Sequence, residues 1–316
     1  MSLHRSSGNH RLGLLLATIT MVIWSFLPNL LKYLLSHIDP YNLTWYRFAI
    51  ASVGFTLLLK YQGALPKLGE LGRRGFVLLL IATLGLAANY ICFLIGLDLT
   101  SPATSQVLIQ IGPVLLALGA ILIFREHFTK TQWFGFAILL LGLVVFFQSQ
   151  LSELAGKVSE AEQYRLGAMA IVAAGIFWAA YGLAQKQLLV LIPSQPLMLC
   201  LFLGCTVLFF PATDLRSVGE LDATGTTGLV IAALATAGAY GCFSAALEHV
   251  EASRVSALIA LVPLGTLASN YLLSSMVPEL VPRVSLSALS LAGAGAVVLG
   301  SLITALSGES TERSSD

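Results

Sequence analysis

Residues 89–98, NYICFLIGLD, recur 150 positions later as residues 239–248, AYGCFSAALE, and this recurrence defines how the chain is organised. Tyrosine, cysteine, phenylalanine, leucine and a final acidic residue hold the same places in both stretches. Apolar runs of low complexity often match by chance, but a matched set of rarer residues indicates an internal duplication. The same gapless frame continues downstream and places Leu108, Ile109 and Pro113 on Leu258, Ile259 and Pro263.

The duplication extends over nearly the whole chain when the offset is allowed to grow slowly, as small loop insertions would require. It predicts a first unit at 12–149, a linker at 150–164, a second unit at 165–306 and a polar tail at 307–316. A slightly larger offset places Arg11, Leu12, Gly13, Trp24 and Lys32 on Arg165, Leu166, Gly167, Trp178 and Lys186. A third offset places Gly135 and Gly142 on Gly293 and Gly300.

Composition identifies the class of protein. Of the 316 residues, 57% are hydrophobic and 10% are charged, whereas a soluble domain carries about 25% charged residues. A net charge of +1 is too small to attract the phosphate backbone of a nucleic acid, so a nucleic acid is excluded as a partner. The four cysteines lie in apolar runs without a CxxC pair, and the five histidines lack metal-ligand spacing, so no disulfide, metal or cofactor is expected. The chain is predicted to be a polytopic membrane protein.

A helix needs about 20 mainly apolar residues to cross the hydrocarbon core. The run from Leu12 to Leu31 is therefore expected to be a span, since it is too long for a cleaved signal. This ruler gives five spans in each unit. Because five is an odd number, the second copy enters the membrane from the opposite side. The predicted fold is an all-α membrane protein with ten transmembrane helices arranged as two inverted five-helix repeats. The ten candidate spans are 12–32, 41–60, 75–97, 102–124, 131–149, 165–189, 196–213, 226–247, 252–276 and 284–306.

Lysine and arginine placement predicts the orientation of the chain. With the N-terminus in the cytoplasm, the inner segments hold eleven of these residues and the outer side holds six. Both termini are therefore expected in the cytoplasm of a multi-pass protein of the plasma membrane.

Two aromatic pairs related by the duplication are candidates for the wall of a solute site. Trp24 and Trp178 lie midway along the first span of their units, whereas interfacial belts collect tryptophan at helix ends. Tyr90 and Tyr240 form the second pair, with Asn89 beside the first and Tyr181 one turn beyond Trp178. Such rings stack on ligands and attract cations; the alternative is ordinary packing against lipid or core.

Polar side chains inside hydrocarbon usually face a cavity or another helix. They are expected either to contact the solute or to hydrogen-bond between helices, a bond worth about 0.6 kcal/mol on average. Pro113 and Pro263 bend their helices and are expected to act as hinges between the halves. The polar candidates are Gln106, Gln110, Ser256, Asn29 and Asn270.

Charged residues near the spans have two interpretations each. Arg47, two turns into the second span, could hold a carboxylate or phosphate or could snorkel to the interface. Lys32 and Lys186 are expected to anchor helix ends, and Asp98 and Glu248 to bond at helix ends or to form gating pairs.

Other features favour packing over chemistry. The glycine pairs on the last span of each unit let helices approach closely, either within the fold or between the subunits of a homodimer. The sequence contains no HExxH, Walker loop or GxSxG motif, so neither an intramembrane hydrolase nor an ATP-driven pump is expected. A membrane-embedded lipid-modifying enzyme would need clustered Asp, His or Arg, and a non-transporting receptor or scaffold would not need polar residues at matched depths.

The order and spacing of several landmarks resemble the EamA-type permeases of the drug/metabolite transporter superfamily over nearly the whole chain. The resemblance implies an inner-membrane secondary transporter of a small organic solute, often an amino acid or related metabolite moved outward, with a cavity formed by the first, third, fourth, sixth, eighth and ninth helices. The second copy departs from the pattern because Glu279 follows its ninth span late. The landmarks are Trp24, Pro40 to Arg47, the run Gln110-Ile-Gly-Pro113, Phe124-Arg-Glu126, and Gly135 to Gly142.

Two other kinds of carrier in the same superfamily fit the sequence less well. A multidrug or organic-cation exporter would, by resemblance to the small multidrug-resistance proteins, carry a glutamate in its first span, and this chain has none there. A carrier of phosphorylated sugars would need several cations in its cavity, and Arg47 alone is a candidate.

Overall fold

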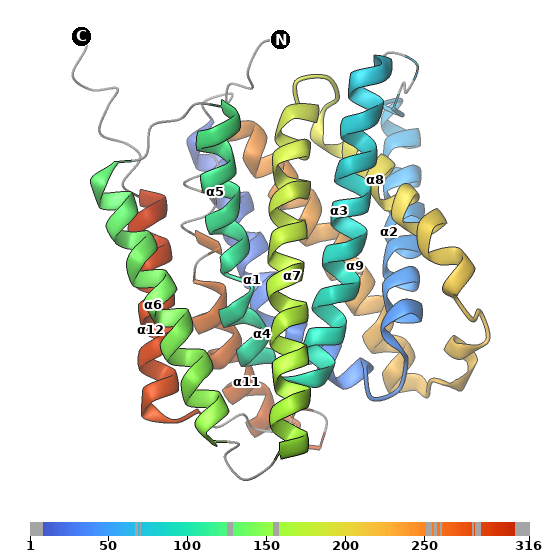
Figure 1. The fold of residues 1–316 in the computed structure, drawn as a ribbon. Helices are drawn as coiled ribbons and strands as arrows, with labels where there is room; N and C mark the ends of the chain where they lie inside the picture. Colours follow the sequence, from blue (N-terminus) through green and yellow to red (C-terminus); the bar gives the residue numbers. More distant parts are fainter. Residues whose placement is uncertain are drawn as a thin grey trace.

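A computed structural model of the chain describes residues 9–66, 69, 71–124, 129–153, 158–250, 255, 258–259, 261–279, 281 and 286–306. Within these ranges the chain is helical and has no strand (Figure 1). The helices of the first half are α1 (His10–Leu34), α2 (Pro40–Gln62), α3 (Gly72–Leu99), α4 (Pro102–Leu108), α5 (Ile111–Phe124) and α6 (Lys130–Glu153). Those of the second half are α7 (Val158–Leu188), α8 (Ser194–Phe209), α9 (Ala223–His249), α11 (Val262–Met276) and α12 (Ala288–Leu306), with 3-10 turns η2 (Phe210–Ala212) and η3 (Ser217–Glu220).

Capping residues explain where several helices begin and end. The Asp39 side chain accepts hydrogen bonds from the first backbone N–H groups of α2, and Pro40 takes the first helical position, where a missing N–H costs nothing. Ser101 and Pro102 repeat this arrangement at α4. Gly63 ends α2 in the left-handed conformation, with φ of 66°, which glycine adopts without strain.

Six helical segments are long and apolar enough to cross a membrane: α1, α3, α6, α7, α9, and α8 continued through η2. The described part of the chain therefore belongs to a membrane protein. The helix α2 has 23 residues but is not among these six, since it carries polar groups such as Asn42 and Arg47.

The predicted span at 102–124 is not one continuous helix, because the structure divides it into α4 and α5. Pro113 has no N–H to donate to the carbonyl of Ile109, and that carbonyl accepts from the backbone N–H of Gly112 instead, at 2.8 Å. The interruption places Ile109 and Gln110 between the two helices.

The packing contacts fix the relative directions of the long helices. Gly85 of α3 lies against Phe177 and Tyr181 of α7, while Gly96 lies against Gly167 and Ile171, so α3 and α7 are antiparallel. In the same way, Gly13 of α1 meets His249, and Gly228 of α9 meets Leu30 and Leu34, so α1 and α9 are antiparallel. The ends of α1 and α3 meet, because the Lys32 ammonium donates to the carbonyl of Leu97 at 3.1 Å.

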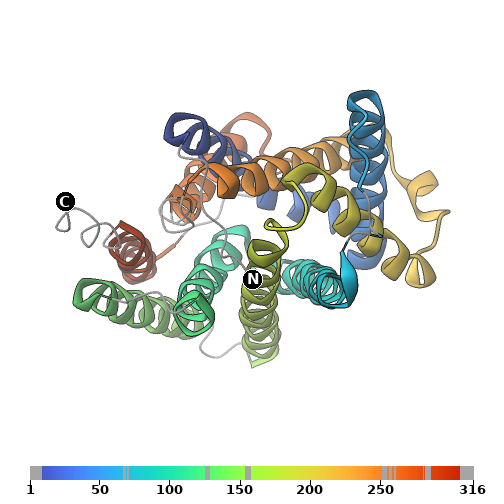
Figure 2. The same ribbon diagram turned by 90° about the horizontal axis from the view of Figure 1, so that it is seen from above.

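The helices α6 and α12 form a closely packed pair at one end of the elongated bundle, opposite α2 and η3 (Figure 2). The glycines predicted as packing positions lie in this contact. A Cβ placed on Gly142 would lie 2.6 Å from the backbone nitrogen of Val297 and 2.9 Å from the carbonyl oxygen of Gly293. Of the two predicted roles, packing within the fold is therefore the one observed.

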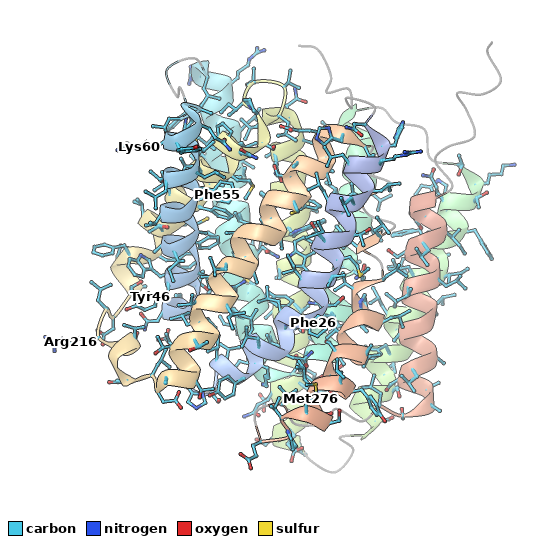
Figure 3. All side chains as sticks on the ribbon, turned by 180° about the vertical axis from the view of Figure 1, so that it is seen from behind. Phe26, Tyr46, Phe55, Lys60, Arg216 and Met276 are labelled. Atoms are coloured by element: carbon cyan, nitrogen blue, oxygen red, sulfur yellow. The ribbon has the colours of Figure 1, made fainter. Side chains whose placement is uncertain are left out.

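The outer surface is predominantly apolar along its length. Large side chains such as Phe26, Leu57 and Leu122 are exposed, as a lipid-facing surface requires. Charged groups lie toward the ends, as Lys60 and Arg216 do at opposite ends of the α2 side (Figure 3).

Candidate solute-binding cavity

The structure contains a cavity that is lined from both halves of the chain, mainly by apolar and aromatic side chains with a few polar groups, a composition typical of small-molecule sites. It lies toward the end of the bundle at which α1 and α3 finish, because its walls use the second half of each of these helices. The lining residues are Trp24, Leu27, Pro28, Leu31, Arg47, Asn89, Tyr90, Phe93, Gln106, Ile109, Gln110, Pro113, Trp178, Tyr240, Ile259 and Val262.

Aromatic rings close the cavity on its other side. Trp24 of α1 lies edge-on to Tyr240 of α9, with ring centroids 5.3 Å apart, and Tyr240 lies 5.6 Å from Tyr90 of α3. One turn further along α9, Phe243 packs between Trp24 at 5.6 Å and Trp178 of α7 at 5.7 Å. Phe243 is buried and does not line the cavity, so the cluster of Trp24, Tyr90, Trp178, Tyr240 and Phe243, called the aromatic floor below, joins four helices beside the cavity. Both predicted aromatic pairs therefore meet at one place.

The fifth aromatic candidate, Tyr181 on α7, has a different position. Tyr181 is completely buried and contacts the Met198 sulfur of α8 with its hydroxyl, at 3.8 Å. It reaches the cavity only through Tyr240, whose ring centroid lies 6.2 Å away. Tyr181 thus supports the floor and does not line the cavity.

The predicted glutamines reach the cavity because of the break between α4 and α5. Gln106 lies on the last turns of α4 and Gln110 lies in the break itself. Gln110 is 1% exposed, and its side-chain oxygen has no hydrogen-bond partner among the described residues. Asn89 also lines the cavity, but its side-chain nitrogen donates to the Ala174 carbonyl at 2.9 Å and ties α3 to α7.

The other two asparagines bind each other instead of lining the cavity, which corrects the prediction that they orient a solute. Asn29 donates to the Ser269 hydroxyl, and Asn270 donates to the Asn29 side-chain oxygen, both at 2.9 Å. Ser269 in turn donates to the Ser25 carbonyl at 2.7 Å. The interhelical alternative is the one observed: these polar groups satisfy one another between α1 and α11.

The two prolines predicted as hinges also differ. Pro113 follows the break between α4 and α5 and lines the cavity. Pro263 occupies the first turn of α11, as Pro113 occupies that of α5, so neither bends a continuous helix as predicted. Pro263 is not among the described residues that line the cavity. Ser256, predicted as a ligand, and Glu126 of the family pattern lie outside the described residues.

Arg47 is buried at the cavity wall, so the snorkelling alternative is wrong. Arg47 is 3% exposed, and its Nε donates a hydrogen bond to the Thr236 hydroxyl of α9 at 2.9 Å. The guanidinium carbon lies 4.9 Å from the centroid of the Tyr90 ring, within cation–π distance. None of the described residues that line the cavity is acidic.

The charged groups at the helix ends make local contacts. The Lys32 ammonium binds the last carbonyls of α3 and lies 3.9 Å from the Asp98 carboxylate, so it joins α1 to α3. The Glu248 carboxylate accepts from the backbone N–H of Ser194, at the start of α8. Lys186 lies in the last turn of α7, as an anchor would.

Sequence reasoning missed seven lining residues, all of them apolar. In sequence an apolar cavity residue has the same appearance as one that faces lipid, so only three-dimensional packing separates them. The missed residues are Leu27, Pro28, Leu31, Phe93, Ile109, Ile259 and Val262.

Comparisons with known proteins agree with this architecture. The model of the EamA-like transporter family matches residues 11–148 and 165–306. An uncharacterized transporter of Haemophilus influenzae is 33% identical over 93% of this chain and 95% of its own length. The uncharacterized inner membrane transporter YhbE of Escherichia coli K12 is 35% identical over 93% of this chain and 91% of its own. A solved crystal structure with 18% identity superposes with a TM-score of 0.65 over 95% of this chain and 98% of that one.

Proposed function

Because the chain belongs to the EamA-like transporter family, we propose that it is a secondary transporter that exports an amino acid or related metabolite across a bacterial inner membrane. The observation that carries this proposal is the cavity, which is enclosed by helices of both halves and walled by aromatic rings and amides. The proposed carrier uses no cofactor and leaves its solute chemically unchanged.

The proposed topology is ten spans in two inverted five-helix repeats. The directions of the helices support it: α1 and α3 are parallel and α3 and α7 are antiparallel, so the matched tryptophan helices α1 and α7 run in opposite directions. Two equivalent pairs also recur, since α1 packs on α9 as α7 packs on α3. A site between inverted repeats can open to either side through equivalent motions.

The proposed motion is alternating access. The cavity lies toward one end of the bundle, and the aromatic floor separates it from the other end. The break before Pro113 supplies a point at which the α4–α5 segment can pivot, because no continuous helical ladder crosses it. With both termini in the cytoplasm, the end at which α1 and α3 finish faces outward. The name of the relative YhbE, an inner membrane transporter, supports the assignment to the inner membrane.

Counterflow in liposomes tests the proposal. Protein reconstituted with an unlabelled amino acid inside should accumulate the radiolabelled form of the same compound without ATP. Leu27→Trp, which fills the cavity, should abolish accumulation, whereas Leu122→Trp on the exposed surface should not. Absence of counterflow for all twenty amino acids and their common metabolites, with folded protein, would contradict the proposal, as would chemical conversion of the solute.

A further inference from the structure

We infer that Arg47 binds a carboxylate of the transported solute, so that the cavity accepts anionic and zwitterionic compounds and rejects amines that lack this group. The inference rests on the proposed transport function and adds to it the chemical group that the site recognises. Three observations support it: the burial of the guanidinium, its free donors and the chemistry of the surrounding walls.

The burial of Arg47 makes its charge costly. The residue is 3% exposed and lies on the eighth position of α2, inside the helical bundle. A cation within a membrane protein normally pairs with an acid or faces water, and a buried charge without a partner is strongly destabilising. Because Arg47 lines the cavity, a negatively charged group bound there would offset this cost.

The protein provides little of that compensation. The Nε atom of Arg47 donates to a neutral hydroxyl, that of Thr236, and the ring of Tyr90 lies against the guanidinium. No described residue forms an ion pair with Arg47, and no described lining residue is Asp or Glu. The four N–H groups on the two terminal nitrogens have no hydrogen bond to a described residue, and such a fork matches a carboxylate in a bidentate geometry.

The position of Arg47 directs this fork toward the solute. The bond from Nε to Thr236 ties the side chain to α9, while the ring of Tyr90 on α3 covers it from another side. Both contacts orient the guanidinium without consuming its terminal donors. Because Arg47 and Tyr90 both line the cavity, a carboxylate there can reach the cation while it remains shielded from lipid.

The other walls suit the second pole of a zwitterion. The unpaired side-chain oxygen of Gln110 can accept a hydrogen bond from an ammonium group. The rings of Trp24 and Trp178 also line the cavity, and aromatic faces attract ammonium groups. A compound with a carboxylate and an amine would thus satisfy both Arg47 and Gln110, whereas an organic cation would place a second positive charge near the first.

Binding to purified protein tests the inference independently of transport. The tryptophan fluorescence of the Trp45→Phe, Trp133→Phe background reports on Trp24 and Trp178. The probes are the twenty L-amino acids, each compared with its carboxamide and with its decarboxylated amine. The amino acids that bind should bind at least about tenfold more weakly as amides or amines, the loss expected when a charge-assisted contact disappears.

Variants sharpen the test. Arg47→Gln should remove the preference for the acid over the amide, and Arg47→Lys should retain part of it. Arg216→Gln is the matched control, since this exposed arginine lies outside the cavity (Figure 3). If Arg47→Gln fails to fold, Arg47→Lys alone decides: an unchanged acid-to-amide ratio in that variant would overturn the inference.

The outcomes separate the inference from the function on which it rests. Equal binding of acid and amide by the parent protein would overturn the role of Arg47 while counterflow still supports a transporter. Failure of counterflow with every amino acid would instead contradict the transporter, whatever the binding preferences are.

Discussion

Glycines bring helices of the two halves together both in the peripheral pair and among the central helices, and the central helices add an aromatic cluster. Between α6 and α12, glycines bring the backbones together, and a Cβ on Gly142 would lie 2.6 Å from the nitrogen of Val297. Among α1, α3, α7 and α9, aromatic rings meet with centroids 5.3–6.2 Å apart. Between α3 and α7 glycines such as Gly96 also bring the backbones together, but the aromatic rings lie where α1, α3, α7 and α9 meet beside the cavity. Substitutions in the pair should affect folding, and substitutions at the rings and amides should affect the solute.

Gly142→Leu should produce the largest effect on stability. The new side chain must enter the backbone of α12, and overpacking of this kind costs about 1–3 kcal/mol or more. The expected result is a lower unfolding temperature and a smaller yield of folded protein in detergent. Gly295→Leu is the control, because no atom lies within 4 Å of the position of its Cβ. Equal destabilisation by both would show that α6 and α12 do not depend on the close contact.

Trp178→Leu should lower solute affinity about two- to twelvefold, since stacking on an aromatic wall contributes about 0.5–1.5 kcal/mol beyond buried area. Leucine retains apolar bulk, so most of the protein should remain folded. The measurement is the concentration dependence of counterflow, with the half-exposed Trp133→Leu as control. A Trp178→Leu protein with unchanged affinity would remove this ring from the solute site.

Gln110→Ala and Asn29→Ala should separate binding from folding, with the smallest effects. Gln110 has an unpaired oxygen at the cavity, so its loss should weaken solute binding about two- to tenfold, the range of one hydrogen bond. Asn29 bonds to Ser269 and Asn270, so its loss should lower the unfolding temperature, at about 0.6 kcal/mol for each interhelical bond. Affinity and unfolding temperature measured on both variants decide the matter. The reverse pattern would exchange their roles.

The sequence predicted the helical class and the meeting of the aromatic pairs because repetition is visible without coordinates. A duplication that matches Trp24 with Trp178 and Tyr90 with Tyr240 also matches their depths, so their convergence follows. The sequence could not separate Gln110 from Asn29, since both are amides in apolar helices. Their difference arises from a break that isolates Gln110 and from serines on another helix that satisfy Asn29.

The sequence also could not predict that the two halves contribute unequally to the cavity wall. Of the sixteen described residues that line it, twelve come from the first half, although the repeats predict equivalent contributions. A carrier that is open to one side of the membrane would line its cavity unequally with the two repeats. The duplication in the sequence carries no information about which side is open. Arg47 has no counterpart in the second half, where Leu203 occupies its place, and only its contacts with Thr236 and Tyr90 distinguish it from an interfacial arginine.

The most direct test of the central claim, two oppositely oriented halves around a shared cavity, is thiol labelling on the two tryptophan helices. Ser36 follows α1 and Leu191 follows α7, and both are exposed. Single cysteines at these positions, with Cys92, Cys200, Cys205 and Cys242 replaced, would be treated with a membrane-impermeant reagent in right-side-out and inverted vesicles. The account predicts that Ser36→Cys reacts from outside and Leu191→Cys from inside. Reaction of both from the same side would contradict it.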